Sequence, residues 1–300
     1  MNTYSILLSL TTEDNDYQQM QAAAAEEAAR RLGVNLQIMY AQNDALNQSD
    51  QLLSIIQSKS AIKPNAILLE PVGTGLEQVA RAAVKAGIGW VVMNRDVDYL
   101  TELRMHSVPV FAVSSDHEEI GRLQGKQMQN LVPNGGHVLY IEGPSSSDAA
   151  PRRTRGMLQT KPANVQLRSM KGQWTETSGH KVVTSFLQLS VSRELAVSAV
   201  VCQNDAMAMG ARKAFEERTT GQERQRWLNI PYVGVDGLPQ TGQAWVNSHL
   251  LAGTIVVPPN SAIALEMMVK ALQTGITPQE RTLTAPIPYP PLVRLSSARA

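Results

Sequence analysis

Short apolar runs alternate with amphipathic segments along most of the chain. The apolar runs have the length and the Val, Ile and Leu content of buried β-strands, and the segments between them repeat their apolar positions with helical spacing. Expected strands are 4–10, 36–40, 66–69, 90–93, 110–113, 137–142, 165–170, 199–203, 232–235 and 254–257. Expected helices are 16–32, 49–59, 75–85, 116–131, one from about 153, 175–189, 206–217, one ending near 248, and 261–272. This order predicts an α/β fold with parallel sheets.

The rhythm of strand and helix is interrupted once. Residues 99–109 form a looser stretch, after which the same order begins again. Two successive blocks of similar length favour two similar lobes over one large sheet. The proline-rich tail, 286–295, is expected to be extended.

The stretch 199–210, AVVCQNDAMAMG, combines a buried strand with the start of a helix. Asn204 stands at the junction, where an Asn side chain is a natural helix cap. The same junction lies at the carboxyl end of a parallel strand, where open α/β sheets bind ligands. The pattern alone leaves both roles open for Asn204.

Polar and aromatic residues gather after the expected strands. They are Thr11, Thr12, Asn15, Tyr17, Glu70, Asn94, Arg95, the loop 145–148, Arg153, Trp174, Asn204, Asp205 and Asp236. Planar carboxylate, amide and guanidinium groups match the spacing of vicinal hydroxyls, and an aromatic face accommodates the C–H face of a sugar ring. Each residue taken singly is explained equally well as a cap or a turn former. Their recurrence at strand ends favours a polyhydroxylated ligand.

The composition is that of an ordinary water-soluble globular protein. The chain has 300 residues, of which 43% are hydrophobic and 18% charged, with a formal net charge of +1. That balance gives no electrostatic reason to expect nucleic acid or a membrane surface as a partner. No apolar run reaches the roughly 20 residues needed to cross a bilayer. The single cysteine, Cys202, excludes an intrachain disulfide and has the neighbours of a buried thiol.

Signals for catalysis, cofactors and metals are absent from the sequence. The segment 121–126, GRLQGK, has one residue too few between its glycines for a phosphate-binding loop. The histidines are scattered without metal-ligand spacing, and no nucleophile elbow occurs. We therefore expect no cofactor, no metal and no enzymatic activity. A sugar hydrolase or isomerase would have to rely on Glu70 and Asp236, neither of which has a recognisable partner.

Four motifs together resemble the type I periplasmic sugar-binding proteins, most of all the ribose-binding group. They are V-C-Q-N-D-x-M-A-x-G at 201–210, V-G-V-D-G at 233–237, Ser115-Asp116 before a helix, and Arg153-x-Arg155-Gly156. The ligand-sensing core of lac-repressor-type regulators is a more distant relative. The resemblance implies two doubly wound αβα lobes joined by a hinge of three crossings, near Ser115, Val257 and Tyr289. The lobes would be 1–115 with 258–289, and 116–257 with 290–300.

The resemblance also implies a set of ligand-binding residues. These are Asn15, Tyr17, Glu70, Asn94 and Arg95 in the first lobe, and Arg153, Trp174, Asn204 and Asp236 in the second. The family's usual Asp-Arg pair is Asn94-Arg95 here, and Gln18 replaces an aromatic residue. Glu70 stands where a ribose binder carries Asn. These departures favour a carbohydrate or polyol other than ribose, such as a hexose or a modified sugar.

The function implied by the resemblance is that of a solute-binding protein, which captures its ligand by hinge closure and passes it to an ABC permease. The alternative is a ligand-sensing module for a histidine kinase, a chemoreceptor or a lac-repressor-type regulator. The first residues lack the basic flank of a secretory signal, so the protein is either periplasmic with its signal removed or cytoplasmic. Direct DNA binding and membrane insertion are not expected.

Overall fold

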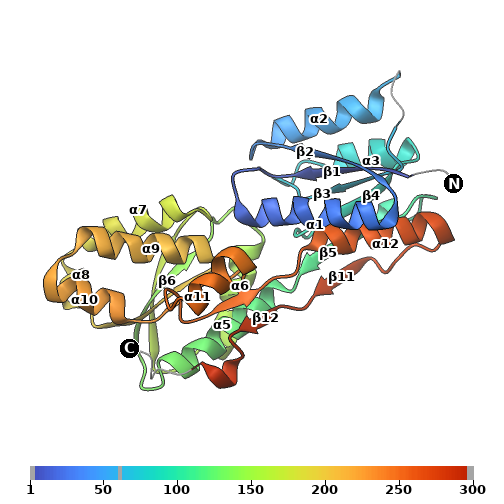
Figure 1. The fold of residues 1–300 in the computed structure, drawn as a ribbon. Coiled ribbons are helices and arrows are strands. Elements are labelled where there is room, and N and C mark those ends of the chain that lie inside the picture. Colours follow the sequence, from blue (N-terminus) through green and yellow to red (C-terminus); the bar gives the residue numbers. More distant parts are fainter. Residues whose placement is uncertain (1–3, 60–62, 296–300) are drawn as a thin grey trace. The chain divides into compact units, whose positions relative to one another are not determined.

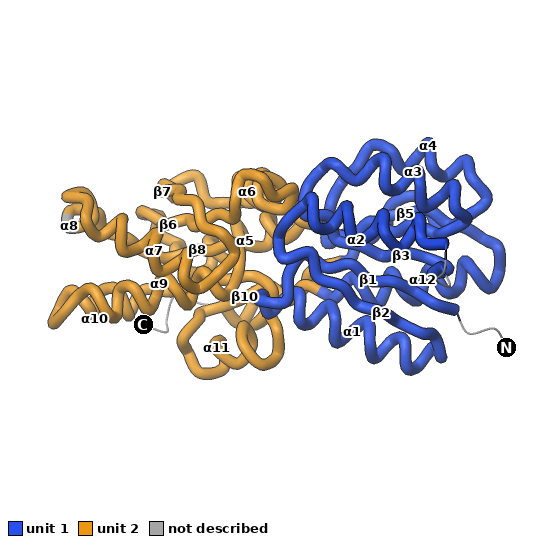
Figure 2. The backbone as a smooth tube through the Cα atoms, turned by 90° about the horizontal axis from the view of Figure 1, so that it is seen from above, with its two compact units in different colours: residues 1–115, 258–284 blue, residues 116–257, 285–300 orange. Residues whose placement is uncertain are grey.

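The computed structural model describes residues 4–59 and 63–295. The packing of Cα positions divides the chain into two compact units (Figure 2). Unit 1 comprises residues 1–115 and 258–284, and unit 2 comprises residues 116–257 and 285–300. The third boundary lies at 284 and not near Tyr289, because residues 287–289 already pair with a strand of unit 2.

Unit 1 contains a six-stranded sheet in which every neighbouring pair is parallel (Figure 1). The strand order is β11-β5-β4-β3-β1-β2. The strands are β1 (Ser5–Leu10), β2 (Asn35–Tyr40), β3 (Ala66–Leu69), β4 (Gly89–Met93), β5 (Val110–Ser115) and β11 (Arg281–Thr284). The helices are α1 (Asp16–Leu32), α2 (Ala45–Gln57), α3 (Glu77–Lys85), α4 (Leu100–Leu103) and α12 (Asn260–Thr274). The expected parallel α/β architecture is confirmed.

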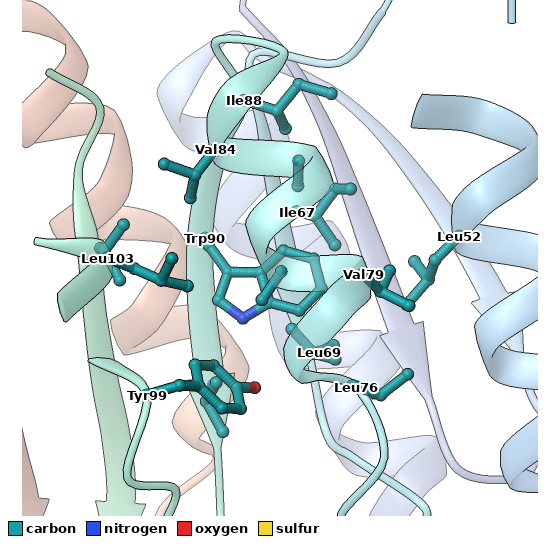
Figure 3. Close-up of a cluster of buried hydrophobic side chains, with 14 of the residues drawn as sticks. Leu52, Ile67, Leu69, Leu76, Val79, Val84, Ile88, Trp90, Tyr99 and Leu103 are labelled. Atoms are coloured by element: carbon teal, nitrogen blue, oxygen red, sulfur yellow. The ribbon is translucent and has the colours of Figure 1, made fainter. Parts of the chain in front are cut away.

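Alternate residues of these strands enter two different cores. Leu7 on β1 packs with Trp90 and with side chains of α2 and α3, whereas Ile6 and Leu8 pack with α1 and α12. Figure 3 shows the first of these cores, where the indole of Trp90 lies among aliphatic side chains. Because successive side chains of a strand point to opposite faces, a sheet that is apolar on both faces must be covered by helices on both.

Unit 2 repeats the plan with a smaller sheet, in the order β7-β6-β8-β9. Its strands are β6 (Gly136–Glu142), β7 (Val165–Lys171), β8 (Val197–Cys202) and β9 (Tyr232–Val233), and β10 (Thr254–Val256) pairs antiparallel with β12 (Ile287–Tyr289). Its helices are α5 (His117–Leu131), α6 (Ala149–Thr160), α7 (Glu176–Leu187), α8 (Val191–Glu194), α9 (Asp205–Arg218), α10 (Gly221–Asn229) and α11 (Ala244–Asn247), with a π-helical turn at Pro239–Gln243 and a 3₁₀ turn at Leu292–Arg294. One core lies against α7 and α9 and the other against α5 and α6.

Several boundaries differ from the sequence expectations for physical reasons. Helix α2 begins at Ala45, before the expected 49, because the Asp44 carboxylate caps the backbone N–H groups of Leu46 and Asn47. Helix α10 and strands β11 and β12 were not expected, since each is short and mostly polar or proline-containing.

The described residues contain neither a membrane-crossing helix nor a cluster of metal ligands. None of their helices combines the length and apolarity that crossing a membrane would require. Likewise, no group of three or more His, Cys, Asp or Glu residues among them is arranged to hold a metal ion.

The buried carboxylate of Asp205 fastens three elements of unit 2 together. Asp205 begins α9, its Oδ1 accepts a hydrogen bond from Thr254 Oγ1 on β10 at 2.7 Å, and its Oδ2 accepts one from the backbone N–H of Gly237 at 2.8 Å. A Cβ at Gly234 would overlap this carboxylate, so glycine is required there. Burial and the negative charge of Asp236 raise the pKa of Asp205 well above its ordinary value of 3.8.

The pH dependence of unfolding tests this arrangement. The pKa of Asp205 is higher in the native state than in the unfolded state. At a pH between the two values, the native state still holds a proton that the unfolded state has lost. The free energy of unfolding therefore falls as the pH rises between them. Asp205→Asn cannot lose this proton. Above pH 3.8, the free energy of unfolding of the wild type is therefore expected to fall relative to that of the variant, as measured by denaturant titrations at stepped pH. A difference between the two proteins that does not change with pH would contradict the assignment.

Candidate functional site

The strand orders place a switch point in each sheet. In unit 1, β1 lies between β2 and β3, and in unit 2, β6 lies between β7 and β8. Chain connections leave such neighbouring strands in opposite directions, which opens a crevice at their carboxyl ends where ligands bind in open α/β sheets. Glu70 follows β3 directly, and Gln203 and Asn204 follow β8. Glu70 in unit 1 and Asn204 in unit 2 therefore stand at the position that the topology favours.

The unit-1 cluster consists of Tyr17, Gln18, Glu70 and Asn94. Gln18 Nε2 and Asn94 Nδ2 both donate to Glu70 Oε2, at 3.0 and 3.1 Å. Asn94 Nδ2 also donates to the Tyr17 hydroxyl at 3.3 Å. Residues from α1 and from the ends of β3 and β4 are thus joined by side-chain hydrogen bonds. Gln18, which the sequence marked only as a departure from the family pattern, is part of this cluster.

Glu70 is the electrostatic centre of the unit-1 cluster. Burial raises the pKa of Glu70, and the opposing effects of the two amide donors and of the nearby Arg95 charge do not cancel that rise. The main chain at Glu70 is also fixed, because Gln48 Nε2 donates to its carbonyl oxygen at 2.9 Å and Gln48 is fully buried. A carboxylate held in this way accepts hydrogen bonds and donates none.

Asn15 has a structural role in the same region. Its Oδ1 accepts hydrogen bonds from the backbone N–H groups of Tyr17 at 2.9 Å and Gln18 at 3.3 Å, and so caps α1. The cap sets where α1 begins and hence where the side chains of Tyr17 and Gln18 lie.

The unit-2 cluster consists of Arg153, Trp174 and Asn204. The guanidinium carbon of Arg153 lies 5.4 Å from the centroid of the Trp174 ring, within the range of a cation–π contact. Asn204 Nδ2 donates to the Trp174 carbonyl oxygen at 2.9 Å, and Asn204 Oδ1 accepts from the Met207 N–H at 3.0 Å. Asn204 therefore caps α9, as its position indicated, and also holds the main chain of Trp174, whose φ is +63°.

Gln203 holds the first turns of α6, the helix that carries Arg153, a role that the sequence did not reveal. Gln203 Nε2 lies within donating distance of the Tyr140 hydroxyl, the Ala150 carbonyl oxygen and Thr154 Oγ1, at 2.8 to 3.0 Å. Its Oε1 accepts from the Gly143 N–H at 2.8 Å, and its carbonyl oxygen accepts from Arg153. The sequence signal for this role was the position of Gln203 beside Asn204 in the motif 201–210. The partners of Gln203 could not be read from that motif, because they lie far away in the sequence.

Two backbone features position the side chains of Trp174 and Asp236 in unit 2. A Cβ at Gly143 would overlap the six-membered ring of Trp174, so the indole lies directly against this glycine. Asp236 has a φ of +106°, which few residues other than glycine adopt. The neighbouring Gly237 N–H is held by the Asp205 carboxylate, which fixes the turn that presents Asp236.

Together the two clusters offer hydrogen-bond acceptors, amide and guanidinium donors, and the aromatic rings of Tyr17 and Trp174. In unit 1, the Glu70 carboxylate contacts two amide groups and lies near the Arg95 guanidinium, and no second carboxylate is paired with it among the described residues. Most glycoside hydrolases use two carboxyl groups that flank the scissile bond. The donors and acceptors of each unit are of the kinds that form hydrogen bonds with hydroxyl groups.

The chain is similar to several known binding proteins. A proposed rhizopine-binding protein of Rhizobium meliloti is 29% identical over 219 residues, which are 69% of this chain and 66% of that protein, just under two thirds. The ribose import binding protein of Escherichia coli is 26% identical over 260 residues, 85% of this chain and 80% of its own length. A solute-binding protein of Actinobacillus succinogenes with bound D-allose superposes with a TM-score of 0.81 at 22% identity, covering 95% of this chain and 97% of that one. The family model described as a periplasmic binding protein domain matches residues 6–276, and the chain belongs to this family.

Proposed function

We propose that this protein is a solute-binding protein that captures a carbohydrate or polyol by hinge closure and delivers it to an ABC importer. The observation that carries the proposal is the pair of clusters at the two switch points, one built around Glu70 and the other around Trp174 and Arg153. We propose that one ligand is bound by both clusters. Relatives named for ribose import and for D-allose binding support a sugar as the ligand.

The departures from the ribose-binding pattern guide the choice of ligand. Glu70 provides an acceptor where ribose binders have an amide, and Trp174 gives a large stacking face. We propose a hexose, a modified sugar or a cyclic polyol whose hydroxyl donates to Glu70 and whose apolar face lies on Trp174. No turnover of the ligand is expected.

The partner and the compartment follow from the same proposal. An ABC permease would receive the ligand, and the protein would work in the periplasm, as the family description implies. The sensing alternative has less support, because the ribose and D-apiose relatives are named as import proteins.

A panel of pentoses, hexoses and cyclitols, followed by thermal shift and calorimetry, tests the proposed function. A ligand that binds only the native state stabilises it by RT ln(1 + [L]/Kd), about 2.7 kcal/mol at a hundredfold excess over Kd. At least one sugar or polyol is expected to raise the melting temperature and to be recovered unchanged. Conversion of the ligand to a product would instead favour the enzyme alternative.

Replacement of Trp174 tests the stacking contact. Trp174→Ala removes the aromatic face and is expected to weaken sugar binding by tenfold or more, about 1.4 kcal/mol. Trp174→Phe keeps a smaller face and should lose less affinity, but should abolish most of the ligand-induced change in tryptophan emission. Unchanged affinity in the alanine variant would remove Trp174 from the site.

Replacement of Glu70 tests the acceptor. Glu70→Gln keeps the shape and removes the charge, and charge-assisted hydrogen bonds are about twice as strong as neutral ones. We expect affinity to fall about tenfold at neutral pH. The affinity of the wild type should also decline as the pH falls through the raised pKa of Glu70, because the protonated carboxyl loses its charge, whereas that of the variant should stay level. Parallel pH profiles would show that Glu70 does not bind the ligand.

Gly143→Ala tests the position of the indole without touching any polar group. The added methyl group must displace the Trp174 ring, so we expect an altered tryptophan emission and a several-fold loss of sugar affinity. Gly75→Ala is the matched control, since a Cβ there meets no atom within 4 Å. Equal affinities in the two variants would contradict the proposed placement of the ring.

A further inference from the structure

The chain passes between the two units three times, after residues 115, 257 and 284. Each crossing has a buried polar residue of unit 1 close to it. Ser115 and Thr284 are the last residues before two of the crossings, and Asn260 lies three residues after position 257. We call these three residues the crossing triad. Ser115 ends β5, Asn260 begins α12 and Thr284 ends β11.

One side chain joins all three members of the crossing triad. Asn260 Nδ2 donates to Ser115 Oγ at 3.0 Å, and Asn260 Oδ1 accepts from Thr284 Oγ1 at 2.8 Å. Asn260 and Ser115 have no exposed surface. A buried amide whose hydrogen bonds break is left without water to replace them. The points at which the three segments leave unit 1 are therefore held together through the Asn260 amide.

The crossing triad is also connected to the unit-1 cluster. Asn260 Nδ2 donates to Asn94 Oδ1 at 2.5 Å, and the Ser115 N–H approaches the same oxygen at 3.4 Å. The other end of the Asn94 amide, Nδ2, donates to Glu70 and to Tyr17. The two ends of one amide thus connect the proposed sugar-binding groups with the triad.

A second connection runs beside the first. Gln21 Nε2 donates to the Tyr17 hydroxyl at 2.9 Å, and Gln21 Oε1 accepts from the backbone N–H of Ser261 at 2.9 Å. Ser261 follows Asn260 in the sequence and in α12. The start of α12 is therefore fixed to the unit-1 cluster by two independent sets of hydrogen bonds.

From these contacts we propose that Asn260 is a positioning residue that couples ligand binding at the unit-1 cluster to the three chain crossings. A ligand that binds Glu70 fixes the Asn94 amide, which in turn fixes Asn260 and the crossing ends. Coupling between two sites is reciprocal, so loosening the triad must weaken ligand binding even though no triad member touches the ligand. The inference rests on the proposed function, and it gives a role to Asn260 and Thr284, which the sequence analysis did not single out.

A pair of threonine substitutions on β11 tests the coupling. Thr284→Val removes the hydroxyl that bonds to Asn260 and keeps the shape of the side chain. Thr282→Val makes the same change on the same strand outside the triad, where the hydroxyl only accepts a hydrogen bond from Gln279. Thr284→Ser restores the hydroxyl and serves as the rescue variant.

Two measurements are made on each protein. Spin labels on Glu27→Cys in unit 1 and Glu216→Cys in unit 2, both exposed positions, report the distribution of distances between the units without any ligand. Calorimetry with the best sugar from the panel gives Kd. Thr284→Val should broaden the ligand-free distribution and raise Kd about fivefold, the lower end of usual coupling factors. Thr282→Val and Thr284→Ser should match the wild type.

The outcomes separate this inference from the proposed function. If Thr284→Val lowers only the melting temperature, with distances and Kd equal to those of Thr282→Val, the triad is merely structural and the inference is overturned. If the wild type binds no sugar in the panel, the proposed function fails, and the ligand-free distance distributions still decide whether the triad restrains the crossings.

Discussion

A polar side chain placed at the carboxyl end of a buried strand must find its hydrogen-bond partners within the protein, because little water reaches it. This constraint shapes both clusters. Glu70 is held by Gln18 and Asn94, and Asn204 is held between α9 and the main chain of Trp174. Each bond removes side-chain freedom before a ligand arrives, so the cost of ordering these groups does not have to be met on binding.

The same constraint explains why capping and ligand binding are compatible roles. Asn204 uses its oxygen for the cap of α9 and one amide hydrogen for Trp174, which leaves it rigid and only 3% exposed. Asn15 fixes the start of α1 and hence the residues that follow it. Sequence reasoning could not choose between cap and ligand for either residue. In the structure, Asn15 caps α1 and Asn204 caps α9. Their contact with a ligand stays a prediction.

Local signals made most of the fold predictable. The α1 helix spans Asp16–Leu32, as expected, between the Asn15 cap and the left-handed Gly33, and β3 coincides with the apolar run 66–69. Contacts between residues that are distant in the sequence could not be predicted. The partners of Gln203 on β6 and α6, the position of Gln18 beside Glu70, and the triad around Asn260 depend on residues distant in sequence. The edge strand β11 was missed because its alternation of polar and apolar residues is too short to stand out.

The most direct test of the account is a crystal structure of the protein with the sugar or polyol that it binds most tightly. The account predicts one ligand molecule with a hydroxyl donating to Glu70 and with its ring on Trp174, and with hydrogen bonds to Arg153 or Asp236. A ligand that touches only one of the two clusters, or neither, would contradict it.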